Sequence, residues 1–331
     1  MQPDLKIGLV GAGWAAGQHS ASISSIGGAR VVSVYDQDPS AGKALAEALG
    51  ATVAKSLEAV LASDIDAVVV STPSGVHCDS VIPALELGKA VFVEKPLSRT
   101  SSDAWAIVEA AERTGTVCAV GYQWRALDYL EPVDRDLQRA QPALLISQGV
   151  GITQARSWFT DDRLSGGLIF ERVSHHIDLQ RMIAGDVAAV SASRGKVALS
   201  GRPDPSETAD DVLTLTLHFA RGAQGLIAVG WAPAGYPSTQ SLTLHTTGTT
   251  FDISLDPDFT LVDRAGASAT HHVHEHPFAR QLRSFLQAVR AGDQSLVHCS
   301  ARDAAGTVET ALAAAASLSE NGLQKVVQTF G

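Results

Sequence analysis

The chain has 331 residues, of which 45% are hydrophobic and 18% are charged. This composition suffices for a large apolar core and excludes a disordered chain, a collagen-like repeat and a coiled coil, while the length suggests two domains. The formal net charge is −10 and there is no block of lysine and arginine, so we expect neither nucleic acid nor an anionic membrane as a partner.

The cysteines and the start of the chain indicate the cellular compartment in which the protein works. Cys78, Cys118 and Cys299 are scattered through apolar runs, which favours buried, reduced thiols over a disulfide framework. The chain enters a strand pattern soon after Met1 without a basic leader, and no apolar stretch is long enough to cross a bilayer. We therefore expect a soluble, cytoplasmic protein.

The first third of the chain alternates short apolar runs with segments of helical period. The runs lack polar alternation, which is typical of strands buried on both faces. They cover residues 5–10, 31–35, 67–70, 91–93 and 117–120. Helix-period segments such as 40–49 and 76–87 lie between them. This βαβ alternation predicts an α/β domain on a doubly wound parallel sheet over residues 1–121.

A glycine-rich turn follows the first apolar run. Gly11, Gly13 and Ala16 fit the Gly-x-Gly-x-x-Gly/Ala fingerprint, in which the second glycine lets the backbone approach a pyrophosphate. Trp14 and Ala15 complete the loop, and the helix that begins there offers amide donors to phosphates. An ordinary structural turn is the alternative.

The second apolar run ends at Asp36, about 20 residues beyond the glycine loop. A carboxylate there can accept both ribose hydroxyls of an adenosine and would repel a 2′-phosphate. Gln37 and Asp38 follow, with no cation to pair with that phosphate, so the sequence favours NAD over NADP. A solvated helix-capping residue is the alternative.

Two later runs end in polar residues at the sheet edge where ligands bind. Ser71-Thr72-Pro73 could line the nicotinamide ribose, or form a simple turn capped by Ser74. In Glu94-Lys95-Pro96 the proline fixes the backbone direction and can allow a cis bond, which aims Lys95 toward the same edge. Lys95 could hold a hydroxyl oxygen there, or be an ordinary surface lysine.

Strict period-2 alternation replaces the continuous apolar runs after residue 121. Leu213, Leu215, Leu217 and Phe219 alternate with polar residues, which indicates a strand with one buried face. Further strands are expected near 242–244 and 251–255, and helices at 167–183, 277–291 and 301–318. We therefore predict a second domain of α+β class over residues 122–331, with an antiparallel sheet covered on one face.

Glu171, His175 and Asp178 share one face of the helix expected at 167–183. A carboxylate one turn from an imidazole can fix its tautomer and stabilise its cation, which makes His175 a candidate general base. The three groups could equally be an ordinary helix pair or bind a divalent metal. Residue chemistry alone leaves these interpretations open.

Taken together, the motifs resemble those of the glucose–fructose oxidoreductase, inositol dehydrogenase and rhizopine-catabolism (Gfo/Idh/MocA) family over nearly the whole chain. The resemblance rests on an ordered set: Gly11 to Ala16, Ser71-Thr72-Pro73 with His77, Glu94-Lys95-Pro96, Gly121-Tyr122 with Arg125, Gly166-Gly167 followed by Glu171 and His175, and the late segments 285–292 and 303–304. Such a set is far more specific than any one motif.

The resemblance implies a Rossmann domain followed by a domain on a large open antiparallel sheet. It also implies hydride transfer between NAD(H) or NADP(H) and a carbinol of a sugar, inositol or related polyol. Carried over by position, Lys95 would orient the hydroxyl, His175 would take its proton and Glu171 would orient His175. The cofactor-binding residues would be Gly11, Gly13, Trp14, Ala15, Ala16, Asp36, Ser71, Thr72, Pro73, His77, Glu94 and Lys95.

Glu171 departs from the commoner pattern, because many family members carry aspartate at this place and a subset carries glutamate. The extra methylene shifts the carboxylate, so Glu171 could orient His175 differently or contact the substrate. Candidate substrate contacts lie in or beside the matching motifs: Tyr122, Arg125, Trp158, Arg163 and His176, with Trp231 and Tyr236 as further candidates.

The segment 271–276 invites a metal-site interpretation, because alternation in a strand would put His272, His274 and His276 on one face. It lies outside the motifs above, and hydride transfer needs no metal. We expect a solvent-facing strand and no metal site.

Two rival functions stay open. A non-catalytic nucleotide-sensing regulator can have the same fold, but it needs neither Lys95 nor His175. NAD-assisted glycoside hydrolysis reduces bound NAD transiently and yields no net NADH. The resemblance further implies a homodimer or homotetramer that pairs through the exposed face of the open sheet.

Overall fold

Each of the two sheets in the chain belongs to its own compact unit. The computed structural model describes residues 3–152, 165–195, 210–232, 237–256, 258–264 and 268–327. The first unit holds Met1–Ala126 and Glu275–Ala305, and the second holds Leu127–His274 and Gly306–Gly331. This differs from a division at residue 121, because a late segment of the chain returns to the first unit.

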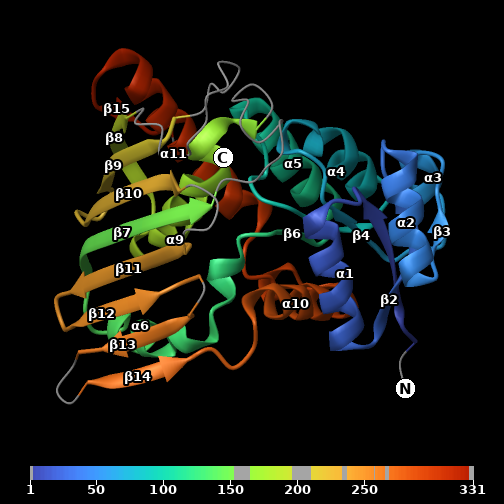
Figure 1. Ribbon diagram of the computed structural model, residues 1–331, viewed down its shortest axis with the longest axis horizontal. Coiled ribbons are helices and arrows are strands. Elements are labelled where there is room, and N and C mark those ends of the chain that lie inside the picture. Colours follow the sequence, from blue (N-terminus) through green and yellow to red (C-terminus); the bar gives the residue numbers. More distant parts are fainter. Residues whose placement is uncertain are drawn as a thin grey trace. The chain divides into compact units, whose positions relative to one another are not determined.

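The first unit is built on a parallel sheet with the strand order β3-β2-β1-β4-β5-β6 (Figure 1). Its strands are β1 Leu5–Val10, β2 Ala29–Tyr35, β3 Thr52–Val53, β4 Ala67–Val70, β5 Ala90–Val93 and β6 Cys118–Val120. Its helices are α1 Trp14–Ile26, α2 Pro39–Leu49, α3 Leu57–Leu61, α4 His77–Glu86, α5 Ser101–Thr114 and α10 Pro277–Ala291. The strand order reverses between β1 and β4, which confirms the predicted doubly wound sheet.

Apolar side chains bury both faces of this sheet, as the continuous apolar runs predict. All positions of β4 and β5 are buried. Helix α10 joins the same core: Leu282 and Phe285 are fully buried, and the ring of Phe285 lies 5.7 Å from that of Phe92 on β5. Figure 1 shows α10 beside α1. Burial of this apolar face explains why α10 belongs with the first unit.

The chain that follows α10 covers the outer edge of β6. The side-chain amide of Gln294 accepts from the amide N of Cys118 (2.8 Å) and donates to its carbonyl oxygen (3.0 Å). The amide N of Val120 donates to the carbonyl oxygen of Cys299 at 3.0 Å. These bonds satisfy backbone groups that an edge strand would otherwise expose.

The second unit is built on a mostly antiparallel sheet of nine described strands, in the order β14-β13-β12-β11-β7-β10-β9-β8-β15. The strands are β7 Pro142–Ile152, β8 Val187–Gly195, β9 Val212–Phe219, β10 Gln224–Ala232, β11 Thr239–Thr246, β12 Thr250–Ser254, β13 Thr260–Asp263, β14 Ala269–His272 and β15 Gln324–Lys325. Only β7 and β10 pair in parallel among these. The predicted large, mainly antiparallel sheet is confirmed.

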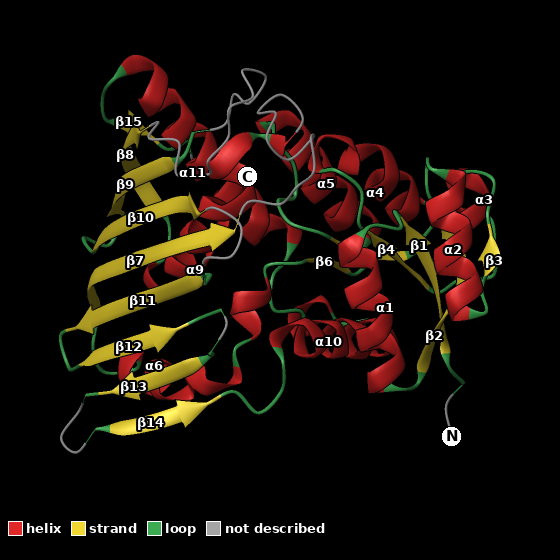
Figure 2. Cartoon of the chain, in the orientation of Figure 1, coloured by secondary structure: helices red, strands yellow, loops and turns green. Residues whose placement is uncertain are grey.

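Helices lie against one face of this second sheet (Figure 2). They are α6 Glu131–Leu137 and α9 Ser174–Ala184, and α11 Ala301–Glu320 runs on from the first unit. On β9, Leu213, Leu215, Leu217 and Phe219 are buried, as their alternation predicts. The helix expected from residue 167 is helical from there, but a π-helical turn, Ile169–Val173, interrupts it before it continues as α9 from Ser174. Such turns occur often at functional sites.

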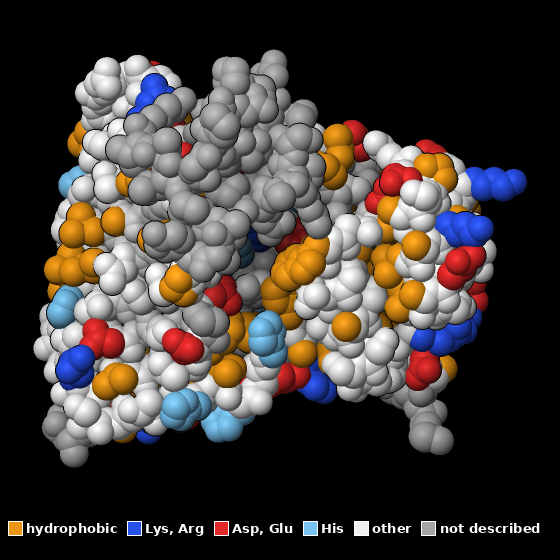
Figure 3. All heavy atoms as spheres, in the orientation of Figure 1, with side chains coloured by type: hydrophobic (Ala, Val, Ile, Leu, Met, Phe, Trp, Pro, Cys, Tyr) orange, Lys and Arg blue, Asp and Glu red, His pale blue; other side chains and the backbone are white. Residues whose placement is uncertain are grey.

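Among the described helices, none combines the length and the apolarity that crossing a bilayer requires. On the face seen in Figure 3, lysine and arginine side chains are interspersed with acidic ones, and the described residues form no single basic patch there. The surface charge in this view is mixed rather than segregated.

Candidate active site

The glycine loop lies at the carboxyl end of β1, where the strand order reverses. Gly11 has φ +95°, and a Cβ on it would lie 2.7 Å from the carbonyl carbon and oxygen of Ser71, so only glycine fits. Above Gly13, by contrast, no described atom lies within 4 Å of the Cβ position. The first turn of α1 carries no acidic residue and no side-chain cap. Open space and unshared amides at this helix N-terminus fit a pyrophosphate.

Asp36 is fixed beside this loop by two backbone amides. Its carboxylate oxygens accept from the amide N of Ala12 (2.6 Å) and of Asp38 (2.7 Å). The cap of α2 is Asp38, whose carboxylate accepts from the amide N of Ser40. The capping alternative for Asp36 is therefore wrong, and its remaining lone pairs fit the ribose hydroxyls of an adenosine.

The turn after β4 offers two enclosed hydroxyl groups. Ser71 Oγ and Thr72 Oγ1 are shut off from solvent, and neither has a hydrogen-bond partner among the described residues. Buried hydroxyls without partners are uncommon in folded proteins and point to a bound ligand that supplies them. Pro73, the next residue, is exposed. The donor set of this edge therefore fits a nicotinamide nucleotide.

His77 braces this turn rather than facing open space. It is fully buried, and its ring nitrogens lie 2.9 Å from the carbonyl oxygen of Thr72 and 3.2 Å from that of Leu97. Burial lowers its pKa, against the opposing effect of those two hydrogen bonds. Because a neutral imidazole carries a single N–H, the neutral ring donates to one of these two carbonyl oxygens.

Glu94 and Lys95 follow β5, and the Lys95–Pro96 peptide is cis, as the sequence suggests. The Glu94 carboxylate accepts from His19 Nε2 at 2.5 Å and from the amide N of Lys95 at 3.1 Å. Burial works to raise the pKa of Glu94, but the hydrogen bond from His19 and the charges of His19 and Lys95 outweigh it and hold the pKa below its ordinary value. The carboxylate is therefore ionised at neutral pH.

His19 is a residue that the sequence analysis did not single out. It lies on α1, is fully buried, and its ring centre is 5.0 Å from that of Phe92 and 5.4 Å from that of Phe278. A histidine among the apolar residues of a helix is a weak signal, because its partner, Glu94, is 75 residues away in the chain. Only the fold brings the two together.

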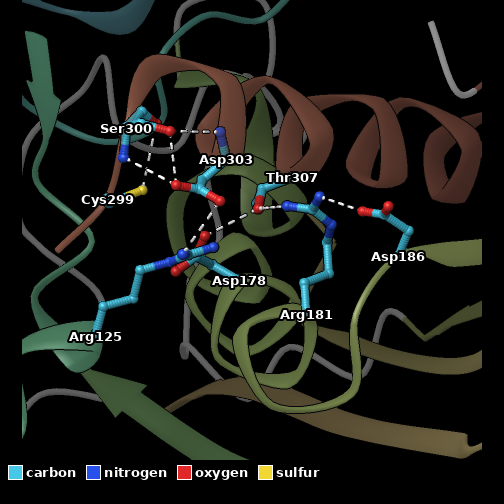
Figure 4. Close-up of polar contacts among 8 residues, drawn as sticks. All are labelled: Arg125, Asp178, Arg181, Asp186, Cys299, Ser300, Asp303 and Thr307. Atoms are coloured by element: carbon cyan, nitrogen blue, oxygen red, sulfur yellow. Dashed lines mark hydrogen bonds and ion pairs between the residues drawn. The ribbon is translucent and has the colours of Figure 1, made fainter. Parts of the chain in front are cut away.

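Tyr122 and Arg125 follow β6 and are both largely buried within the first unit. Tyr122 is 1% exposed, and the Arg125 side chain, 7% exposed, lies 3.6 Å from Asp303. Figure 4 shows Asp303 held in turn by Ser300, whose amide and hydroxyl both donate to its carboxylate. The side chain of Arg125, a predicted substrate contact, is therefore already held by its ion pair with Asp303.

Trp14, at the start of α1, is an exposed residue of the glycine loop and makes a ring contact in the first unit. Its side chain is 54% exposed, and its ring packs edge-on against Phe278 at 5.9 Å. This leaves most of the indole accessible at the start of α1.

In the second unit, Glu171 belongs to the π turn and His175 to the first turn of α9, and both are half-buried. Asp178 is instead buried and accepts from Thr307 Oγ1 at 3.0 Å. Figure 4 shows Arg181 donating to Thr307 and to Asp186. Asp178 is thus part of the helix packing. The described residues hold no cluster of three or more histidine, cysteine or acidic side chains placed for a metal.

His176 points toward the sheet. Its Nε2 lies 2.9 Å from Gln240 Oε1 on β11, and the side chain has no exposed surface. Burial lowers the pKa of His176 to about 3, helped by the nearby charge of Arg172 and opposed by the bond to Gln240. It is therefore neutral, and its tautomer is set by Gln240 rather than by solvent.

Glycines on the covered face of the sheet make room for long polar side chains. A Cβ on Gly149 would lie 1.9 Å from Gln240, and one on Gly225 would lie 2.2 Å from Gln180. The amide of Gln180 donates to Ser147 Oγ at 2.8 Å. The interface between α9 and the sheet is therefore partly polar, which the apolar alternation of the strands does not reveal.

The same arrangement recurs at Gly151, where a Cβ would lie 2.0 Å from the guanidinium carbon of Arg172. Trp231, a further substrate candidate, is 2% exposed and stacks under that guanidinium. Trp158, Arg163 and Tyr236 lie outside the described residues.

The histidine-rich segment does not form one continuous strand. β14 ends at His272, so the expected alternation through residue 276 is wrong. His272, His274 and His276 are exposed. In the second unit the amide N of His274 donates to Asp128 at 3.0 Å, and in the first unit His276 caps α10 by accepting from the amide N of Phe278. These two hydrogen bonds stabilise the backbone around His274 and the start of α10.

Comparisons with known proteins agree over most of the chain. Residues 5–122 match the oxidoreductase family with an NAD-binding Rossmann fold, and residues 142–252 match the GFO/IDH/MocA C-terminal domain. The chain is 30% identical over 314 residues to inositol 2-dehydrogenase 4 of Saccharopolyspora erythraea, covering 87% of this chain and 86% of that protein. It is 26% identical over 313 residues to the NAD(+)-dependent scyllo-inositol 2-dehydrogenase of Bacillus subtilis, covering 90% of each.

Solved structures share the fold. A levoglucosan dehydrogenase in complex with NADH and levoglucosan superposes with a TM-score of 0.87 at 19% identity, covering 98% of this chain and 100% of that one. The resemblance read from the motifs is thereby confirmed. The chain belongs to the GFO/IDH/MocA family of oxidoreductases, whose N-terminal domain is an NAD-binding Rossmann fold.

Proposed function

We propose that the chain is an NAD-dependent dehydrogenase or reductase that acts on a carbinol carbon of a sugar, inositol or related cyclic polyol. The observation that carries this proposal is the carboxyl edge of the first sheet, where the glycine loop, Asp36 and Lys95 follow β1, β2 and β5. Relatives named as inositol dehydrogenases of similar length support the substrate class.

The nucleotide is proposed to bind along that edge. The pyrophosphate would occupy the open space over Gly13, Asp36 would hold the adenosine ribose, and the enclosed hydroxyls of Ser71 and Thr72 would bind the nicotinamide half. When bound, NAD+ supplies a hydride acceptor at C4 of its nicotinamide. The carboxylate of Asp36 disfavours the 2′-phosphate of NADP by like charge.

The proton chemistry is proposed to fall to Lys95 and His175. The Lys95 ammonium would donate a hydrogen bond to the reacting hydroxyl oxygen and stabilise its developing negative charge. His175 Nε2 or Nδ1 would accept the hydroxyl proton as the C–H electron pair leaves with the hydride. Glu171, one turn earlier, would hold the imidazole in the required tautomer and favour its cation. In the reductive direction the same proton returns to the oxygen.

The test is a scan for NADH formation across inositols, hexoses, anhydrosugars, uronic acids and sugar phosphates. We expect turnover of a defined polyol that Lys95→Ala and His175→Ala each reduce by about 10²–10⁴-fold while NADH binding persists. Lys89→Ala and His245→Ala are matched controls. Lys89 lies just before the other end of β5 and bonds Ile65, and His245 bonds Thr250 on the second sheet.

The two rival functions predict different results in the same assay. A hydrolase of the NAD-assisted kind would cleave aryl glycosides without net NADH, and a sensor would bind NADH tightly with no turnover in either assay. Stoichiometric NADH that depends on Lys95 and His175 would exclude both rivals.

We also propose that the protein works in the cytoplasm as a homodimer or homotetramer. All three cysteines are free thiols. Val150 and Leu226, 39% and 40% exposed, lie on the face of the second sheet opposite the glycines that accommodate Gln240 and Gln180. A monomeric mass in solution would contradict the oligomer.

A further inference from the structure

Arg172 occupies an unusual position in the second unit. It belongs to the π turn, directly after Glu171, and its guanidinium carbon lies 5.1 Å from the centre of the Trp231 ring on β10. Below it, Gly151 of β7 has no side chain, and any Cβ there would collide with the guanidinium at 2.0 Å. One glycine and one indole therefore form a slot that fits a flat cation.

The guanidinium in this slot lacks a counter-ion among the described residues. Its Nε is shut off from solvent without a hydrogen-bond partner, and Asp256 and Glu171 act on it only through their charge. Burial lowers the pKa of Arg172, while those two carboxylates raise it. Arginine nevertheless stays protonated in proteins, so the slot holds a positive charge.

A purely structural role explains this arrangement poorly. Stacking on an indole contributes about 0.5–2 kcal/mol, whereas withdrawing a cation from water without a paired anion costs several kcal/mol. An apolar side chain would fill the space at lower cost. The Arg172 residue as a whole is half-buried.

Arg172 also lies close to the proposed proton-transfer residues of its own unit. The charge of Glu171 acts on it, and its own charge acts on His176, next to His175 in the chain. A ligand group held by Arg172 would therefore belong to a molecule that extends toward this motif.

We propose that Arg172, stacked on Trp231, binds an anionic oxygen group of the substrate, so that the preferred substrate is an acidic sugar or polyol bearing a carboxylate or a phosphate. A guanidinium held flat presents its N–H groups as a fork that matches such a group. The inference rests on the proposed function, because the same molecule must carry the carbinol that is oxidised.

The experiment compares D-glucuronate, D-glucose 6-phosphate and D-glucose, and likewise D-galacturonate and D-galactose, by kcat/KM with NAD+. We expect the intact protein to prefer an acidic member over its neutral counterpart, and Arg172→Gln to reduce that preference by about 10²-fold with little change for the neutral sugar. Arg172→Lys should keep part of the preference, because it keeps the charge but loses the fork. The better acidic substrate distinguishes a carboxylate from a phosphate.

Controls separate this inference from the function on which it rests. Arg194→Gln removes a half-exposed arginine near Asp210 and should change nothing. The melting temperature measured with NADH, with and without each acid, reports binding without turnover and also shows whether Arg172→Gln is folded. If that variant is unfolded, Arg172→Lys carries the comparison.

Three outcomes overturn or keep the inference. An unchanged ratio of acidic to neutral turnover in a folded Arg172 variant overturns it, as does an intact protein that neither turns over nor is stabilised by any acid. Stabilisation by an acid that depends on Arg172, without NADH formation from any polyol, would keep the anion site and overturn the dehydrogenase.

Discussion

The edge of the first sheet and the covered face of the second sheet place functional side chains in opposite ways. Along the first edge, polar groups stand just beyond strands that are buried on both faces, so Ser71, Glu94 and Lys95 occupy the first positions after apolar runs. On the second sheet, polar groups lie within the interface, in spaces left by Gly149 and Gly151. Sites of the first kind lie at strand ends. Sites of the second kind lie where glycine, which has no side chain, leaves space on a strand.

The largest effect expected in the first region concerns the His19–Glu94 pair. His19→Ala leaves the largely buried Glu94 carboxylate without its side-chain donor, and we expect a loss of about 3–5 kcal/mol in the free energy of unfolding at neutral pH. Adding Glu94→Gln to His19→Ala should restore part of the lost free energy of unfolding, because the double variant buries no charge. The cycle comprises the intact protein, the two single variants and the double variant. Chemical denaturation of the four proteins measures the coupling, and additive losses would contradict it.

The same pair predicts a pH dependence with a definite sign. The pKa of Glu94 is lower in the folded protein than its ordinary value, so the ionised carboxylate stabilises the fold above the ordinary glutamate range, near about pH 4. That contribution is lost as the pH falls through the folded pKa. His19→Ala removes the hydrogen bond that contributes most to lowering this pKa, so the stability lost between the ordinary pKa and the folded pKa should be smaller in that variant.

The glycine loop gives the next largest effect and a matched control. Gly11→Ala places a Cβ 2.7 Å from the Ser71 backbone at φ +95°, and we expect a loss of about 1–3 kcal/mol in stability together with NADH binding. Gly13→Ala meets no described atom. It should fold normally and weaken only NADH binding. Equal loss of stability in both variants would mean that the loop geometry is not what requires glycine at position 11.

The difference between strand-end sites and glycine spaces explains which parts of the molecule the sequence predicts. Continuous apolar runs identify the strands of the first sheet, and the fingerprint identifies Gly11 and Gly13, because each of these signals lies within a few residues. Asp36 is identified because it ends the next apolar run, at the spacing from the loop that the fingerprint expects. Arg172 and Gln240 carry no such signal, since their neighbours come from other strands and from glycines that look like turns. The predicted second domain, 122–331, includes α10, which the structure assigns to the first unit, because its amphipathic pattern shows a buried face but not which core receives it.

Asp36 offers a smaller, more specific test of the first region. Asp36→Ala removes the acceptor for the ribose hydroxyls and the charge that repels a 2′-phosphate. The ratio of the Kd for NADPH to that for NADH should fall about tenfold, which corresponds to about 1.4 kcal/mol. Fluorescence titration of both nucleotides measures it, with Asp38→Ala as the control that removes only the cap of α2. Tighter NADPH binding by the intact protein would contradict the assigned role.

The smallest effect belongs to the glycine spaces of the second sheet. Gly149→Ala forces the Gln240 amide to move, since the new Cβ would lie 1.9 Å from its oxygen, and it thereby disturbs the bond to His176. Because the amide is the flexible end of a side chain, we expect a loss of about 1 kcal/mol, at the low end for overpacking. On β8, Gly195→Ala finds only Val212 at 3.8 Å and should cost nothing. If both substitutions are neutral in thermal unfolding, Gly149 does not hold open the space that Gln240 occupies.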